Sequence, residues 1–204
     1  MAMMVKTSES AFLVMHYQNG IVSPEAAFAV SGTAAQVKKR NCLAKTSNVL
    51  KAVRDAGMMV IFVNFELRPG WPEIKQPAFP LLAGLKKDTF IRGDWDASLP
   101  KEIGPESKDI TVINFNSNSF LDSDLDRILR TGNIKHLYMA GVATNFVVES
   151  TARYAVELGY DVTVLEDLCA GFKEEWHEFA ITQILPYFCA IGQSKEFVPA
   201  LGKS

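Results

Sequence analysis

Short runs of apolar residues alternate along this chain with segments of helical periodicity. The first run, Ala11 to Met15, is apolar at every position, which is typical of a strand buried on both faces of a parallel sheet. Similar runs predict five more strands, at residues 58–65, 110–115, 136–140, 161–165 and 189–192. Helices are predicted between them, at about residues 33–56, 122–130, 144–158 and 174–186. Because strands that alternate with helices form βαβ units, the pattern predicts an α/β fold.

Length and composition indicate one globular domain over residues 1–204. Hydrophobic residues make up 48% of the chain and charged residues 22%, which is ordinary for a domain with a buried core. The formal net charge of −2 gives no reason to expect nucleic acid as a partner. No apolar run reaches about eighteen residues, so neither a membrane span nor a membrane partner is expected.

The cysteines and the N-terminus favour a cytoplasmic location. Cys42, Cys169 and Cys189 are too few and too irregularly spaced for a disulfide framework. Residues 1–10 lack the basic-then-apolar pattern of a signal peptide. A reducing cytoplasm is therefore the simplest expectation.

The segment 66–107 is the least regular part of the chain and holds six of the nine prolines. Loops of this length in compact domains are usually functional or disordered. Its aromatic residues favour packing over disorder, and they are Trp71, Phe79, Phe90 and Trp95. We expect the segment to cover one end of the sheet, and a role in a subunit interface is compatible with that.

Polar residues follow several predicted strands. His16 and Asn114 lie at or just after strand ends, as do the turn at 141–147 and residues 167–169. Ligands of parallel sheets bind beyond the carboxyl ends of the strands, so we expect these positions to converge. In the turn, Gly141 ends the strand and Thr144 is a suitable N-cap. The free amides at such a helix start favour negative charge, although an ordinary strand-to-helix turn has the same pattern.

The turn, Gly-Val-Ala-Thr-Asn-Phe-Val-Val-Glu-Ser-Thr-Ala-Arg from Gly141, resembles the nucleophile turn of the isochorismatase-like, or cysteine hydrolase, superfamily. The segments at 11–19, 112–120 and 159–167 resemble other parts of the same family, so the likeness covers nearly the whole chain. It implies a three-layer sandwich with a six-stranded parallel sheet in the order 3-2-1-4-5-6. The family's usual Asp, Lys and Cys triad is replaced here by His16, Asn114 and Val147.

The resemblance implies an altered site. Valine has no nucleophilic atom, so no thioester forms at Val147, whereas an imidazole at His16 suits acid–base chemistry. The family's oxyanion hole maps onto the backbone amides of Ala143 and Val147, and its usual cis peptide onto Val142–Ala143. Trp95 and Phe120 are additional candidate substrate contacts. A plain structural role remains an alternative for both His16 and Asn114, and Cys169 is a less favoured substitute nucleophile.

Two functions remain open. One is a hydrolase that acts on a small carbonyl or carboxylate compound without a cysteine, with His16 as acid or base. The other is a catalytically silent protein that binds a small molecule in the retained pocket. No metal is expected, because residues 64–68 lack the histidine found in the metal-binding branch of the family, and no cofactor is expected either. The resemblance also implies a homodimer or homotetramer.

Overall fold

The computed structural model describes residues 5–26, 28, 31–75, 78 and 80–202. Its centre is a six-stranded sheet in the order β3-β2-β1-β4-β5-β6, in which every neighbouring pair is parallel. The strands are β1 Ser10–Met15, β2 Met59–Phe65, β3 Ile110–Asn114, β4 His136–Val142, β5 Asp161–Ala170 and β6 Ala190–Gly192. The predicted sheet and strand order are confirmed.

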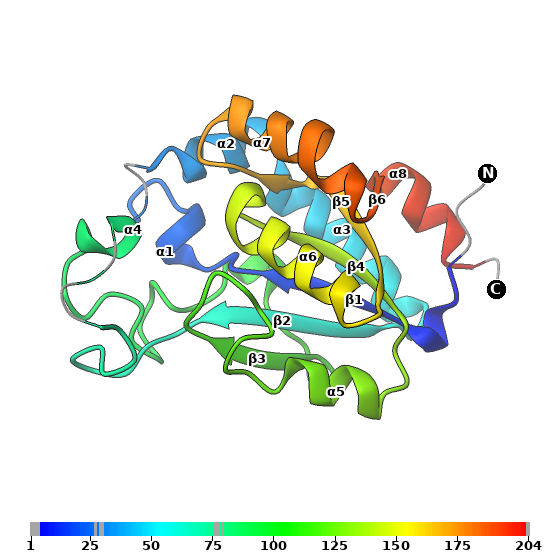
Figure 1. Ribbon diagram of the computed structural model, residues 1–204, viewed down its shortest axis with the longest axis horizontal. Helices are drawn as coiled ribbons and strands as arrows, with labels where there is room; N and C mark the ends of the chain where they lie inside the picture. The colour runs from blue at the N-terminus through cyan, green and yellow to red at the C-terminus, as the bar shows by residue number, and fades with distance from the viewer. Residues whose placement is uncertain (1–4, 27, 29–30, 76–77, 79, 203–204) are drawn as a thin grey trace.

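Helices cover both faces of this sheet (Figure 1). One core lies between the sheet and α2, α3 and α8, and the other lies between the sheet and α5 and α6. The helices are α1 Asn19–Val22, α2 Thr33–Arg40, α3 Cys42–Asp55, α4 Pro80–Ala83, α5 Leu125–Thr131, α6 Glu149–Glu157, α7 Glu174–Phe179 and α8 Ser194–Phe197. The result is a three-layer α/β sandwich. Within the described ranges, no helix is long and apolar enough to cross a membrane.

The predicted single helix at 33–56 is wrong, because it divides into α2 and α3 at Asn41. Asn41 has a φ of 54°, in the left-handed region, where asparagine is one of the few residues tolerated. Its backbone N–H bonds back to Lys38 and Val37, which ends α2. The following residue then starts α3 in a new direction.

Two other predicted helices contain irregular turns. The helix at 144–158 begins as a π-helical turn, Thr144–Val148, and continues as α6. The helix at 174–186 begins as α7, widens into a π turn at Ala180–Ile184 and tightens into a 3-10 turn at Leu185–Tyr187. Pro186 has no N–H to donate to the preceding turn, which accounts for the change near that end.

The segment 66–107 packs against the carboxyl end of the sheet. Trp71 and Phe90 are buried, whereas Trp95 is 55% exposed. A single parallel bridge pairs Leu67 with Ile91, and α4 lies at the end toward which β2 points (Figure 1). Phe79 lies outside the described residues. The segment is thus a packed cover over that end of the sheet.

Gly141 sits where β1 and β4 approach closely, so we predict that Gly141→Ala destabilises the protein. A Cβ here would lie 2.9 Å from Val148 Cγ2 and 3.1 Å from Met15 Cβ and O. Overpacking of this kind costs about 1–3 kcal/mol. Urea unfolding of Gly141→Ala and of the control Gly104→Ala, whose Cβ would have no neighbour within 3.7 Å, measures the difference. Equal stabilities of the two variants would contradict the prediction.

Candidate active site

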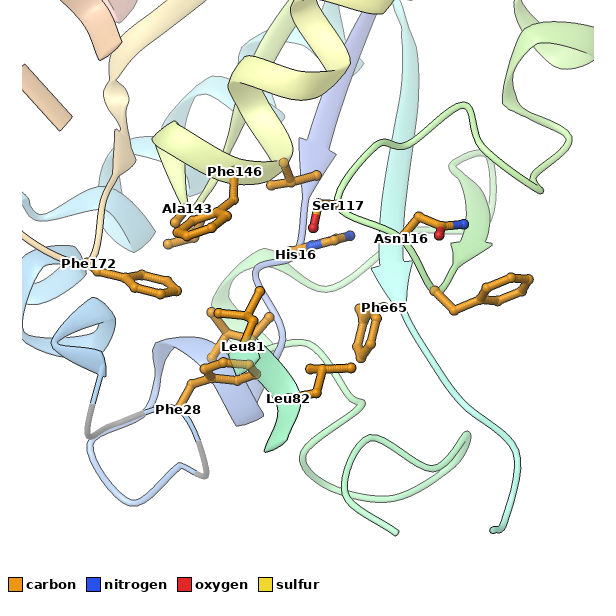
Figure 2. Close-up of a pocket in the computed structure, with 14 residues that line it drawn as sticks. His16, Phe28, Phe65, Leu81, Leu82, Asn116, Ser117, Ala143, Phe146 and Phe172 are labelled. Atoms are coloured by element: carbon orange, nitrogen blue, oxygen red, sulfur yellow. The ribbon is translucent and has the colours of Figure 1, made fainter. Parts of the chain in front are cut away.

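A pocket opens at the carboxyl ends of β1 and β4, the two central strands where the strand order reverses. His16 directly follows β1, and Ala143 directly follows β4. Both line the pocket, which has an empty volume of about 550 Å³ including its open mouth. His16 lies in its middle, with Ala143 and Phe146 on one side and Leu81 and Leu82 on the other (Figure 2). The topology therefore brings His16 to the nucleophile turn, as the strand ends predict.

His16 is held by Asn114, the last residue of β3. The distance from His16 Nε2 to Asn114 Oδ1 is 2.9 Å. Asn114 Nδ2 donates to the carbonyls of Asn116 at 2.9 Å and Asn118 at 3.0 Å, so its amide oxygen must face the imidazole. His16 therefore donates from Nε2. A neutral imidazole carries one proton, so Nδ1 keeps a lone pair.

The imidazole of His16 is neutral at neutral pH. Burial lowers the pKa of His16 from 6.5 to about 4, and the hydrogen bond with Asn114 opposes this shift only in part. Only 7% of the residue is exposed, and none of the described residues within the pocket lining is a carboxylate that could stabilise an imidazolium. The group is thus an acceptor at Nδ1 rather than an acid in the resting site.

Gln18 fixes the chain just after His16, and sequence reasoning missed it. Its Nε2 donates to Phe65 O at 2.6 Å and Ala97 O at 3.1 Å, and its Oε1 accepts from Phe65 N at 2.8 Å. The fully buried Gln18 side chain thereby ties the end of β1 to β2 and to the cover segment. Because His16 has a left-handed φ of 56°, this clamp also holds an uncommon backbone conformation. The sequence signal for this role was a glutamine that closely follows an apolar strand, two residues after His16.

The turn after β4 combines a cis peptide bond with a π-helical turn. The peptide bond between Val142 and Ala143 is cis. Ala143 O accepts from Phe146 N at 3.1 Å and from Val148 N at 3.4 Å, which starts the π turn. Val147 also lines the pocket, and it offers only methyl groups there.

The expected N-cap role of Thr144 is wrong. The residue before the turn, Ala143, occupies the cap position, and no side chain caps the helix. Thr144 Oγ1 instead lies 2.8 Å from Nδ1 of the buried His177. On the other side of this imidazole, His177 Nε2 is 3.6 Å from Glu166 Oε2. The turn is anchored to α7 by its side chain rather than capped by it.

Glu166 in turn joins this anchor to α2. Contact with His177 is the largest influence that lowers the pKa of the Glu166 carboxyl to about 2. Arg40 Nη2 lies 2.6 Å from Glu166 Oε2, and Arg40 Nε donates to Cys169 O at 2.8 Å. These charged groups lie behind the turn and are not part of the pocket lining.

Two other candidate residues, Trp95 and Phe120, are not among the residues that line the pocket. Trp95 is 55% exposed, and its backbone carbonyl accepts a hydrogen bond from the Asn19 side chain. Phe120 packs in the core against Tyr154 and Tyr160, at ring-centroid distances of 5.7 and 6.0 Å. The expectation that these two rings contact substrate is not met by the pocket lining.

Cys169 is not positioned to replace the missing thiol. It is completely buried in β5, and its Sγ lies 3.4 Å from Leu165 O. Burial also raises the pKa of its thiol, which opposes formation of the thiolate. Among the described residues, no group of three or more His, Cys, Asp or Glu side chains could hold a metal ion.

The neutral burial of His16 predicts a pH-dependent stability. The folded-state pKa lies below the unfolded one, so the unfolded chain binds more protons between pH 6.5 and about 4. The contribution is complete above pH 6.5 and lost as the pH falls toward 4, by about 3 kcal/mol. Urea titrations at several pH values measure it, and His16→Asn should flatten the slope. Equal slopes for both proteins would refute the burial of a neutral imidazole.

Comparisons with known proteins agree with this geometry. A family model of the isochorismatase domain matches residues 10–196. The ureidoacrylate amidohydrolase RutB of Caulobacter vibrioides is 32% identical over 98% of this chain and 94% of its own length. An isochorismatase family protein from Burkholderia thailandensis superposes with a TM-score of 0.79 at 25% identity, over 99% of this chain and 100% of that one. A cysteine hydrolase from Pseudomonas syringae pv. phaseolicola has a TM-score of 0.82 at 23% identity, over 98% and 95% of the two chains. The chain belongs to the isochorismatase family of hydrolases.

Proposed function

We propose that this protein hydrolyses a small carbonyl compound with water, rather than a cysteine thiolate, as the nucleophile. The observation that carries the proposal is the hydrogen bond between His16 and Asn114, which leaves the Nδ1 lone pair of His16 without a proton. An amide is the favoured substrate class, because the relative from Caulobacter vibrioides is named an amidohydrolase.

His16 has the role of a base in this reaction. The oxygen of a bound water attacks the carbonyl carbon while one water proton passes to Nδ1 of His16. The carbonyl π electrons move to oxygen, and the resulting oxyanion is stabilised by the backbone amides of Ala143 and Val147, which both line the pocket. The oxyanion then re-forms the carbonyl as the C–N bond breaks, and the imidazolium gives its proton to the departing amine nitrogen, which leaves a carboxylic acid and a free amine. The low pKa of His16 makes it a weak base but an effective acid for this second step.

A second candidate function is ligand binding without turnover. It is favoured by the loss of the charged pair and the thiol, since His16, Asn114 and Val147 supply none of them at neutral pH. The two functions share a pocket and differ only in chemistry. Turnover of a ligand that binds therefore separates them.

The base role predicts that His16→Asn lowers kcat by about 10²- to 10⁴-fold. Asparagine tolerates the left-handed backbone at this position, so the fold should persist. Ammonia release from a panel of primary amides supplies the assay. The matched control is His136→Asn, since His136 lies at the far end of the sheet, where Nε2 is 2.9 Å from Thr163 Oγ1. An unchanged kcat in His16→Asn would exclude the base role.

The same role fixes the direction of the pH dependence. The lone pair on Nδ1 is available only above the pKa of His16, so kcat/KM should rise with pH through about 4 and remain level at neutral pH. Initial rates between pH 3.5 and 8, on protein shown to be folded at each pH, measure the profile. A falling limb in that range that disappears in His16→Asn would mean that the acid form is the active one.

Ser117 tests whether water is the nucleophile. It is an exposed residue of the pocket lining, and its hydroxyl is directed into the pocket (Figure 2). Direct attack by water predicts that Ser117→Ala retains kcat within about threefold, because a retained general base still activates water. Steady-state rates and a search for an acyl-enzyme by mass spectrometry provide the measurement. A loss above about 10²-fold would make the serine hydroxyl the nucleophile.

A further inference from the structure

Aromatic rings form a continuous arc around the pocket. The rings of Phe146 and Phe172 have centroids 4.8 Å apart, and Phe172 lies 6.5 Å from Phe28. The arc continues from Phe28 to the buried Phe90 at 5.7 Å and from Phe90 to Phe65 at 5.5 Å. Aromatic rings at these centroid distances pack favourably, so the five phenylalanines form one continuous packed surface.

The arc ends at His16, whose ring lies 5.9 Å from that of Phe65. Leu81 and Leu82 of the cover segment lie on the side of the pocket opposite Ala143 (Figure 2). If a ligand places its carbonyl group between His16 and Ala143, the rest of the ligand would therefore contact apolar side chains. Four of the lining phenylalanines lie at or shortly after the ends of β2, β3, β4 and β5, namely Phe65, Phe115, Phe146 and Phe172.

The absence of charged side chains from the described pocket lining also limits which ligands can bind. Among the described residues that line the pocket there is no Lys, Arg, Asp or Glu. The structure does not describe residues 27, 29–30, 76–77 and 79, and the sequence has no charged residue at these positions. Burying a carboxylate without a cation is costly. We assign the amides of Ala143 and Val147 to one oxyanion, and no described side chain of the lining supplies a counter-ion for a second anionic group.

We propose that the pocket takes an uncharged carbonyl compound with an aromatic or branched apolar body, and that it discriminates against ligands carrying a free carboxylate. The orientation of the carbonyl toward His16 and Ala143 rests on the proposed function. The preference for uncharged ligands rests on the lining alone.

Calorimetric titration with three probes tests the proposal directly. Phenylacetamide should bind at least about tenfold more tightly than phenylacetate at pH 7.5, because only the acid is charged there. It should also bind about 10- to 100-fold more tightly than acetamide, because its ring buries apolar surface. Phenylacetate binding as tightly as phenylacetamide would overturn the exclusion of anions. Acetamide binding as tightly as phenylacetamide would overturn the role of the arc.

A cation placed in the lining should reverse the discrimination. Leu81→Lys adds one at a half-buried position, and we expect it to raise the affinity for phenylacetate by tenfold or more. Gln183→Lys adds the same charge at an exposed position outside the lining and should leave the preference for the amide intact. Phe115→Lys is the second variant if Leu81→Lys does not fold. Failure of a folded lining variant to gain phenylacetate affinity would count against the proposal.

Binding and turnover fail in different ways. The titrations are repeated on His16→Asn, which lacks the proposed base but keeps the arc. If this variant and the unaltered protein bind phenylacetamide and neither releases ammonia from any amide, the proposed ligand class is supported and the proposed hydrolysis is contradicted. If the unaltered protein hydrolyses amides but prefers those bearing a carboxylate, the proposed hydrolysis is supported and the proposed ligand class is contradicted.

Discussion

The hydrogen bond between His16 and Asn114 joins the ends of β1 and β3 across the end of β2, and the rest of the site depends on it. Asn114 can accept from the imidazole only because its amide nitrogen is already used by two carbonyls of the loop that follows β3. The uncharged Asn114 side chain thus determines which ring nitrogen of His16 carries the proton. The pair is neutral because burial lowers the pKa of His16 to about 4 and an amide carries no charge.

The sheet was predictable because its four inner strands, β1, β2, β4 and β5, are largely buried on both faces and therefore read as apolar runs. The exception is β5, which continues to Ala170 beyond the predicted end at 165. Glu166 and Asp167 interrupt the apolar pattern, but they remain in the strand because Arg40 pairs with the first and Ser194 donates to the second. Partners so distant in sequence are invisible to a local pattern.

The site was predictable in its positions but not in its contacts. Strand ends and the family resemblance placed His16, Asn114 and the turn together, because the sheet topology fixes where strand ends meet. The tautomer of His16 and the clamp by Gln18 depend on hydrogen-bond geometry that sequence does not encode locally. Similarly, Thr144 has the composition of a cap, but a buried histidine from α7 competes successfully for its hydroxyl. The pocket rings come from segments far apart in the chain.

The uncharged lining of the pocket has a consequence for the end of a catalytic cycle. Hydrolysis of a neutral amide would make a carboxylic acid that is ionised at neutral pH, and the lining offers this anion no counter-ion among its described residues. Water solvates the carboxylate far better than phenylalanine side chains do. Under the proposed function, the surface that binds the uncharged substrate would therefore bind the carboxylate product less well, so product dissociation would be favoured without a conformational change.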